Sequence, residues 1–162
     1  SWSRRRRQAS GNIAIPAMTP MEESMPTTAH FTLAYWCVLI AALLPLVCAT
    51  LAKKGGFGRA PQAGGYDNHA PREWLARQQG AAARANAAQA NTFEALPFFI
   101  GAVIIAHQLG ARQGLVDALA LAFIALRIVY IWLYVADKAM ARSAVWTLAL
   151  AVNIAILFSG YR

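Results

Sequence analysis

Four long apolar stretches, separated by short polar segments, dominate the sequence. They cover residues 31–52, 84–109, 115–136 and 143–160. Each is close to the length of about 20 residues that a helix needs to cross a hydrocarbon core of about 30 Å. No segment has the alternating pattern of a half-buried strand. The sequence therefore predicts an all-α membrane protein, an antiparallel four-helix transmembrane bundle.

The segments outside these stretches predict little further folded structure. Residues 1–30 are polar, basic and contain prolines, which is typical of a disordered segment, and Met25 is an alternative first residue. After the first span, Asp67 and Asn68 precede Pro71 and Trp74. We expect a short interfacial helix there, with an Asx cap, Pro71 in its first turn and Trp74 as its membrane anchor.

Composition and charge agree with a membrane protein. Hydrophobic residues make up 58% of the chain and charged residues only 14%, which excludes a water-soluble domain. The net charge is +8, but the run Arg4–Arg7 supplies four of the positive charges and most others flank apolar segments. The basic character therefore indicates membrane topology and membrane lipids as partners, and no nucleic acid.

Cys37 and Cys48 lie in the same predicted helix, about 16 Å apart, which excludes a disulfide between them within one chain. Neither has a partner at metal-ligand spacing, so the sequence predicts packing or lipid-facing cysteines and no metal site. The loops after the first and third spans carry eight Lys and Arg residues, against two on the other side. This imbalance predicts cytoplasmic loops and both termini outside.

Polar side chains recur on one face of two spans. Arg84, Asn91 and Glu94 share a face of the second predicted helix, and Arg127, Tyr130 and Tyr134 form a stripe on the third. Ionisable residues inside a membrane are costly and usually face a partner or a cavity. Two interpretations stay open. Glu94 and Arg127 pair as structural glue between helices, or the whole group lines an anion- and amide-binding pocket that opens to the cytoplasm.

Two motifs on these helices resemble a known family. Residues 88–97 read AQANTFEALP, which is similar to the Ala-x-x-Asn-x-x-Glu-x-x-Pro signature of the MAPEG family (membrane-associated proteins in eicosanoid and glutathione metabolism). Residues 127–134 read RIVYIWLY and resemble that family's Arg-x-x-Tyr-x-x-x-Tyr motif. The resemblance covers residues 31–160, and the loop around residues 67–72 is similar to poorly characterised bacterial members.

The resemblance implies a homotrimer in a bacterial inner membrane, with glutathione as co-substrate bound between subunits. It implies a transferase or peroxidase that joins the glutathione thiolate to lipophilic electrophiles or reduces lipid hydroperoxides. A guanidinium near the thiol raises its thiolate fraction, and arginines bind carboxylates bidentately. Arg142 and Tyr130 are the expected catalytic residues. The expected glutathione contacts are Arg84, Asn91, Glu94, Arg127, Tyr130 and Tyr134.

The chain departs from the family pattern in ways that keep other functions open. Ala87 stands where glutathione-active members commonly carry Arg, and Ala95 stands where they often carry Tyr or Asn. Arg84 lies one turn before Ala87. Arg142 lies one residue beyond Ala141, which aligns near the thiol-activating Arg of one branch. The alternatives are a non-enzymatic protein with the family fold and, less favoured because the first span is uncharged, a small exporter.

Overall fold

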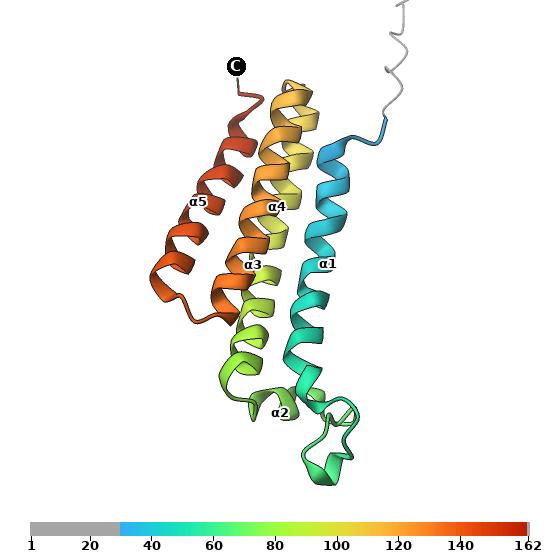
Figure 1. The fold of residues 1–162 in the computed structure, drawn as a ribbon. Coiled ribbons are helices and arrows are strands. Elements are labelled where there is room, and N and C mark those ends of the chain that lie inside the picture. The colour runs from blue at the N-terminus through green and yellow to red at the C-terminus, as the bar shows by residue number, and fades with distance from the viewer. Residues whose placement is uncertain (1–29, 162) are drawn as a thin grey trace, which may run out of the picture. The chain divides into compact units, whose positions relative to one another are not determined.

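The computed structural model describes residues 30–161, and every regular element within them is helical. Four long helices lie side by side (Figure 1). They are α1 (Leu33–Lys53), α3 (Gly80–Gln108), α4 (Gln113–Val135) and α5 (Ala139–Phe158). Between α1 and α3 come the short helices η1 (Lys54–Gly56), η2 (Pro61–Ala63) and α2 (Pro71–Ala76). Residues 1–29 of the segment predicted to be disordered lie outside the described residues.

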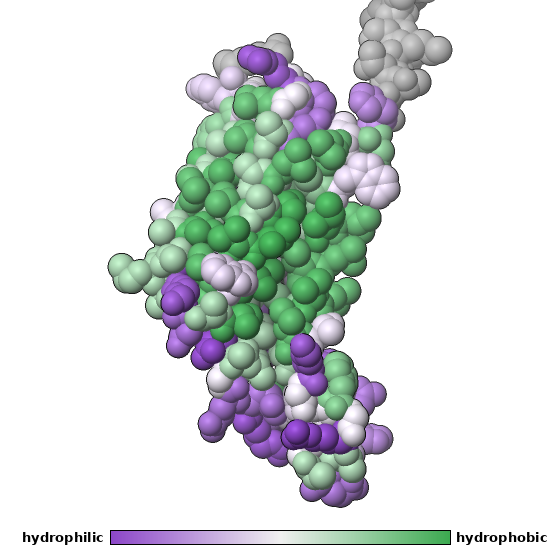
Figure 2. Space-filling model, in the orientation of Figure 1, coloured by the Kyte–Doolittle hydropathy of each residue, from purple (hydrophilic) through white to green (hydrophobic). Residues whose placement is uncertain are grey.

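All four long helices are long and apolar enough to cross a membrane. In Figure 2, hydrophobic residues cover the middle of the bundle and hydrophilic residues gather at the end that carries α2. The predicted spans match the helices except at two starts. Helix α3 begins at Gly80 and α5 at Ala139, each four residues before the predicted start. Alanine-rich sequence favours helix in water as well as in lipid, so these helices extend beyond their apolar cores.

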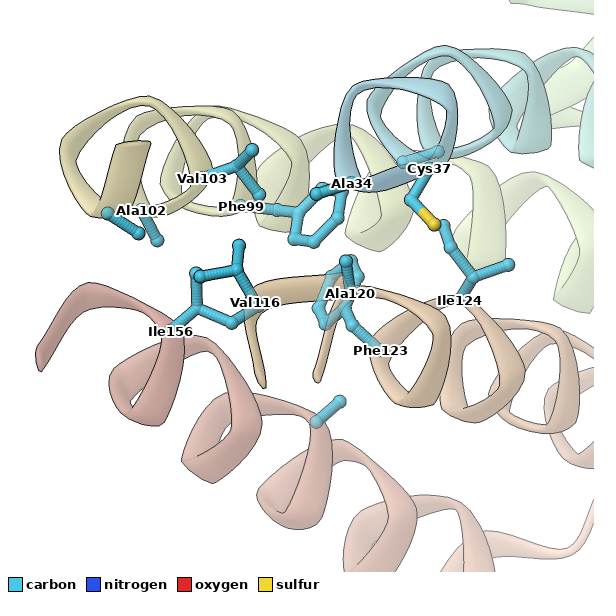
Figure 3. Close-up of a cluster of buried hydrophobic side chains, with 13 residues drawn as sticks. Ala34, Cys37, Phe99, Ala102, Val103, Val116, Ala120, Phe123, Ile124 and Ile156 are labelled. Carbon is cyan, nitrogen blue, oxygen red and sulfur yellow. The ribbon is translucent and has the colours of Figure 1, made fainter. Parts of the chain in front are cut away.

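The core is built from alanines and a cysteine, branched aliphatic side chains and two stacked aromatic rings. Phe99 of α3 lies parallel to Phe123 of α4, with ring centroids 4.2 Å apart. Figure 3 shows them with buried side chains from all four helices, which include Ala34 and Cys37 of α1. In a membrane, close packing at small residues drives helix association. Cys37 and Cys48 are both free and fully buried, so they pack inside the bundle and do not face lipid.

Polar side chains fix the start of α1 against α3 and α4. Asp117 Oδ1 accepts hydrogen bonds from the Ala34 N–H at 2.9 Å and from Gln113 Nε2 at 2.7 Å. Thr32 Oγ1 accepts from the Tyr35 N–H and lies 2.9 Å from His107 Nε2. The first turn of a helix has free N–H groups. Asp117 belongs to α4 and therefore caps the first turn of a different helix, α1.

Replacing Asp117 by leucine is expected to lower the free energy of unfolding in detergent by about 1–2 kcal/mol, because the Ala34 N–H loses a charged acceptor. Asp117→Asn keeps an acceptor oxygen and is expected to lose less. Denaturant-induced unfolding followed by circular dichroism measures both variants. Equal stability of wild type and Asp117→Leu would show that this contact does not hold α1.

Two expectations for the loop between α1 and α3 are wrong: the membrane anchor at Trp74 and the Asx cap of the short helix. Trp74 is only 5% exposed: its Nε1 donates to the Gly64 carbonyl at 3.3 Å, and its ring meets Tyr66 edge-on. It therefore packs the loop together and does not anchor it in lipid. The expected Asx cap is also wrong, because Ala70 precedes α2 without a side-chain cap. Asp67 lies too far upstream and instead accepts from the His69 N–H.

Candidate ligand-binding site

A buried arginine joins α3 to α4. Arg127 is 2% exposed, and its Nη2 donates to Asn91 Oδ1 at 3.1 Å and to Thr92 Oγ1 at 2.9 Å. Thr92 in turn donates to the Ala88 carbonyl at 2.7 Å. A guanidinium in an apolar bundle is costly unless such acceptors compensate it. Asn91 and Thr92 are therefore placed to hold a charge that the span could not otherwise bury.

Glu94 does not pair directly with Arg127. Asn91 Nδ2 donates to Glu94 Oε2 at 3.4 Å, while Asn91 Oδ1 accepts from Arg127. The one ion pair within residues 30–161 joins Arg84 and Asp137. Of the two interpretations that the sequence left open, the Glu94–Arg127 pair is therefore wrong as a direct contact. The carboxamide of Asn91 offers a donor and an acceptor at once, so it links the two charged groups as a relay.

A column of two tyrosine rings between two guanidinium groups runs from Arg127 toward α5. The Arg127 Cζ lies 4.3 Å from the centroid of the Tyr130 ring, and the Tyr130 and Tyr134 rings meet edge-on at 5.6 Å. Arg142, at the start of α5, places its Cζ 4.2 Å from the Tyr134 ring centroid. Burial decreases along this column, since Tyr130 is buried while Tyr134 and Arg142 are half-buried. The column thus runs from the core toward an accessible surface.

Two neighbouring pockets open beside this column. The larger, of about 430 Å³, is lined by polar and aromatic side chains: Asn91, Tyr130, Tyr134, Arg142, Ser143, Trp146 and Thr147. The smaller, of about 160 Å³, shares Asn91 and Trp146 with it and is mainly apolar. Its other lining residues are Glu94, Ala95, Phe98, Phe123, Arg127, Ala149, Leu150 and Asn153. The two pockets therefore form a polar and an apolar compartment with a common wall.

Arg84 is not part of the column formed by Arg127, Tyr130, Tyr134 and Arg142. Its Nε donates to the Val135 carbonyl at 3.0 Å, and its Nη1 lies 3.8 Å from Asp137 Oδ2. It lines neither pocket. In this position it satisfies a free carbonyl at the end of α4, as basic residues commonly do. Its expected contact with glutathione stays a prediction.

Several lining residues of the site were missed by sequence reasoning, and three polar or aromatic residues of the site show why. Thr92 and Trp146 gave no signal that separates them from packing residues, because their roles depend on how the helices are rotated. Asn153 did give one, since it is a carboxamide in an otherwise apolar span. It is buried at 3% exposure and lines the smaller pocket. No group of three or more metal-ligating side chains occurs in the described part of the chain.

Comparison with protein-family models matches residues 33–161 to the MAPEG family. The chain belongs to the MAPEG family. No curated protein and no solved structure matches it. The family match confirms the resemblance carried by the motifs on the second and third spans, and the four candidate spans make this MAPEG protein a multi-pass membrane protein. Within it, Asn91, Arg127, Tyr130 and Tyr134 form one connected group.

Proposed function

We propose that this MAPEG protein binds glutathione in the 430 Å³ pocket and joins its thiolate sulfur to lipophilic electrophiles, or uses glutathione to reduce lipid hydroperoxides. The active form is a homotrimer of antiparallel four-helix subunits in a bacterial inner membrane. Its loops between α1 and α3 and between α4 and α5 lie in the cytoplasm, where glutathione is available. The electrophiles reach the site from the lipid.

The observation that carries this proposal is the column beside the pocket in which two phenol rings lie between two guanidinium groups. Glutathione offers two carboxylates, two amides, an ammonium group and a thiol. Arg142 lines the pocket and complements an anion, while the tyrosine hydroxyls and Asn91 complement amides. Glu94, which is exposed beside Asn91, complements an ammonium group. The side chains at and beside this pocket thus complement one anionic group, the amides and the ammonium group of the tripeptide.

The catalytic roles follow from charge. A free thiol has a pKa near 8.5, so only a few per cent is thiolate at neutral pH, and a nearby guanidinium raises that fraction. Arg142 is the accessible guanidinium at this pocket, because Arg127 is buried and hydrogen-bonded to α3. Tyr130 lines the same pocket and donates a hydrogen bond to the thiolate. Arg127 positions Asn91 and the Tyr130 ring.

The test is turnover of chlorodinitrobenzene with glutathione by the purified protein in detergent. The thiolate sulfur forms a bond to the ring carbon, chloride leaves with its electron pair, and the thiol proton goes to solvent. We expect the rate to exceed that of empty micelles by at least about a hundredfold. One preorganised donor that stabilises developing negative charge in an enzyme site typically changes a rate by about that factor or more. The Arg112→Leu variant changes an exposed residue that lines neither pocket and is expected to remain active.

A second candidate function is a MAPEG protein without glutathione chemistry. It is favoured by one observation, the engagement of Arg84 by Val135 and Asp137, together with Ala87 at the neighbouring signature position. In that case the chain has no arginine near the start of α3 for a glutathione carboxylate. Absence of turnover together with absence of glutathione binding would favour this candidate over the enzyme.

A further inference from the structure

The smaller pocket has the size and lining of a site for an aromatic ring. Its volume is about 160 Å³, close to the engineered cavity of about 150 Å³ that holds benzene. Aromatic side chains from three helices line it: Phe98 of α3, Phe123 of α4 and Trp146 of α5. Aromatic rings attract one another in offset and edge-on arrangements, so such a lining favours a flat aromatic ligand over an alkyl chain.

Two buried polar atoms lack partners, and both belong to residues that line this pocket. Asn153 Oδ1 and Arg127 Nε have no hydrogen bond among the described residues, although both side chains are at most 3% exposed. Leaving such atoms unpaired in an apolar interior is costly. A small molecule in the pocket that both residues line supplies the missing partners once the side chains turn toward it.

The two orphaned atoms specify complementary groups on that molecule. Oδ1 of Asn153 needs a donor, and the Nε–H of Arg127 needs an acceptor. The terminal torsion of an asparagine is soft, so the carboxamide can turn its oxygen toward a ligand. A hydroxyl group supplies both a donor and an acceptor. The pocket also holds one positive and one negative side chain, Arg127 and Glu94, which favours a neutral ligand.

We propose that the smaller pocket binds the ring of a lipid-soluble phenol, with its hydroxyl on Asn153 and Arg127 and its ring among Phe98, Phe123 and Trp146. This site adjoins the larger pocket but does not depend on glutathione chemistry. Phenols partition into membranes and reach a pocket between helices from the lipid. Hydrogen bonds to the hydroxyl orient the ligand, and contacts between its ring and the aromatic lining supply most of the affinity.

The experiment compares three fluorinated probes by fluorine NMR on the full-length protein in detergent, without glutathione. The probes are para-fluorophenol, para-fluoroanisole, which lacks the donor, and fluorobenzene, which lacks both polar functions. Empty micelles correct for partitioning. We expect para-fluorophenol to bind the wild type about tenfold or more tightly than para-fluoroanisole, the factor expected for one satisfied buried hydrogen bond.

Variants assign the effect to Asn153. Asn153→Leu, similar in size and apolar, is expected to remove the phenol preference and to bind fluorobenzene more tightly. Leu150→Ala, one turn earlier on the same helix and pocket, is expected to keep the preference. If Asn153→Leu does not fold by circular dichroism, Asn153→Thr retains a hydroxyl and serves instead, with a reduced preference. Equal binding of the phenol and the anisole by wild type would overturn the proposal and leave bound water as the partner.

Discussion

Arg127→Leu is expected to lower the free energy of unfolding in detergent by about 3 kcal/mol and to remove glutathione binding. The guanidinium makes two hydrogen bonds to α3, to Asn91 at 3.1 Å and to Thr92 at 2.9 Å. Hydrogen bonds to charged groups contribute about 1.5–3 kcal/mol each, and leucine replaces some of the lost packing. Binding is lost as well, because Asn91 and the Tyr130 ring lose the group that positions them.

Arg112→Leu is the matched control for that variant. Arg112 precedes α4 and is exposed, and its side chain makes no capping hydrogen bond. The same change of charge and shape there is expected to alter stability by less than about 0.5 kcal/mol. Chemical unfolding monitored by circular dichroism measures both proteins. A loss in Arg127→Leu no larger than in Arg112→Leu would mean that the buried network is not what holds α3 against α4.

Arg142→Ala is expected to reduce turnover with glutathione by at least about tenfold at neutral pH, while the fold stays intact. Arg142 is half-buried and stacks on the Tyr134 ring at the edge of the larger pocket, so its removal opens no core cavity. Its loss takes away the positive charge that raises the thiolate fraction. The rate of chlorodinitrobenzene conversion at saturating glutathione measures the effect.

The pH dependence separates this role from a structural one. Above the ordinary thiol pKa of about 8.5 glutathione ionises without help, so the rate of Arg142→Ala is expected to rise toward wild type as the pH increases. Arg142→Lys keeps a positive charge and is expected to retain more activity at neutral pH. A deficit of Arg142→Ala that stays constant from neutral to alkaline pH would contradict thiolate stabilisation by this residue.

The spans and the polar stripes could be predicted from the sequence because strong physical rules govern them. A membrane requires long apolar helices, and a charged residue within one must find a partner, which singles out Arg127. The column of Arg127, Tyr130 and Tyr134 then follows from helical periodicity, since residues three and four apart share a face. Membership of the MAPEG family followed from two motifs on neighbouring helices.

The remaining features depend on geometry that a linear pattern does not contain. The choice of Asn91 over Glu94 as the partner of Arg127 rests on helix rotation and side-chain reach. Arg84 points to the end of α4 because α3 begins before the apolar stretch and places it beside Val135. Trp74 turns inward because Gly56 leaves room for its ring, a contact eighteen residues away in the chain.

Glutathione binding to the purified protein, measured by calorimetry in detergent, tests the central claim most directly. Wild type is expected to bind in the micromolar-to-millimolar range, more weakly after Tyr130→Phe, and with unchanged affinity after Arg112→Leu. Weaker binding by Arg84→Ala would further show that Arg84 leaves Asp137 to reach a glutathione carboxylate. No binding by wild type at millimolar glutathione would contradict the account and leave a MAPEG membrane protein whose polar pocket serves another ligand.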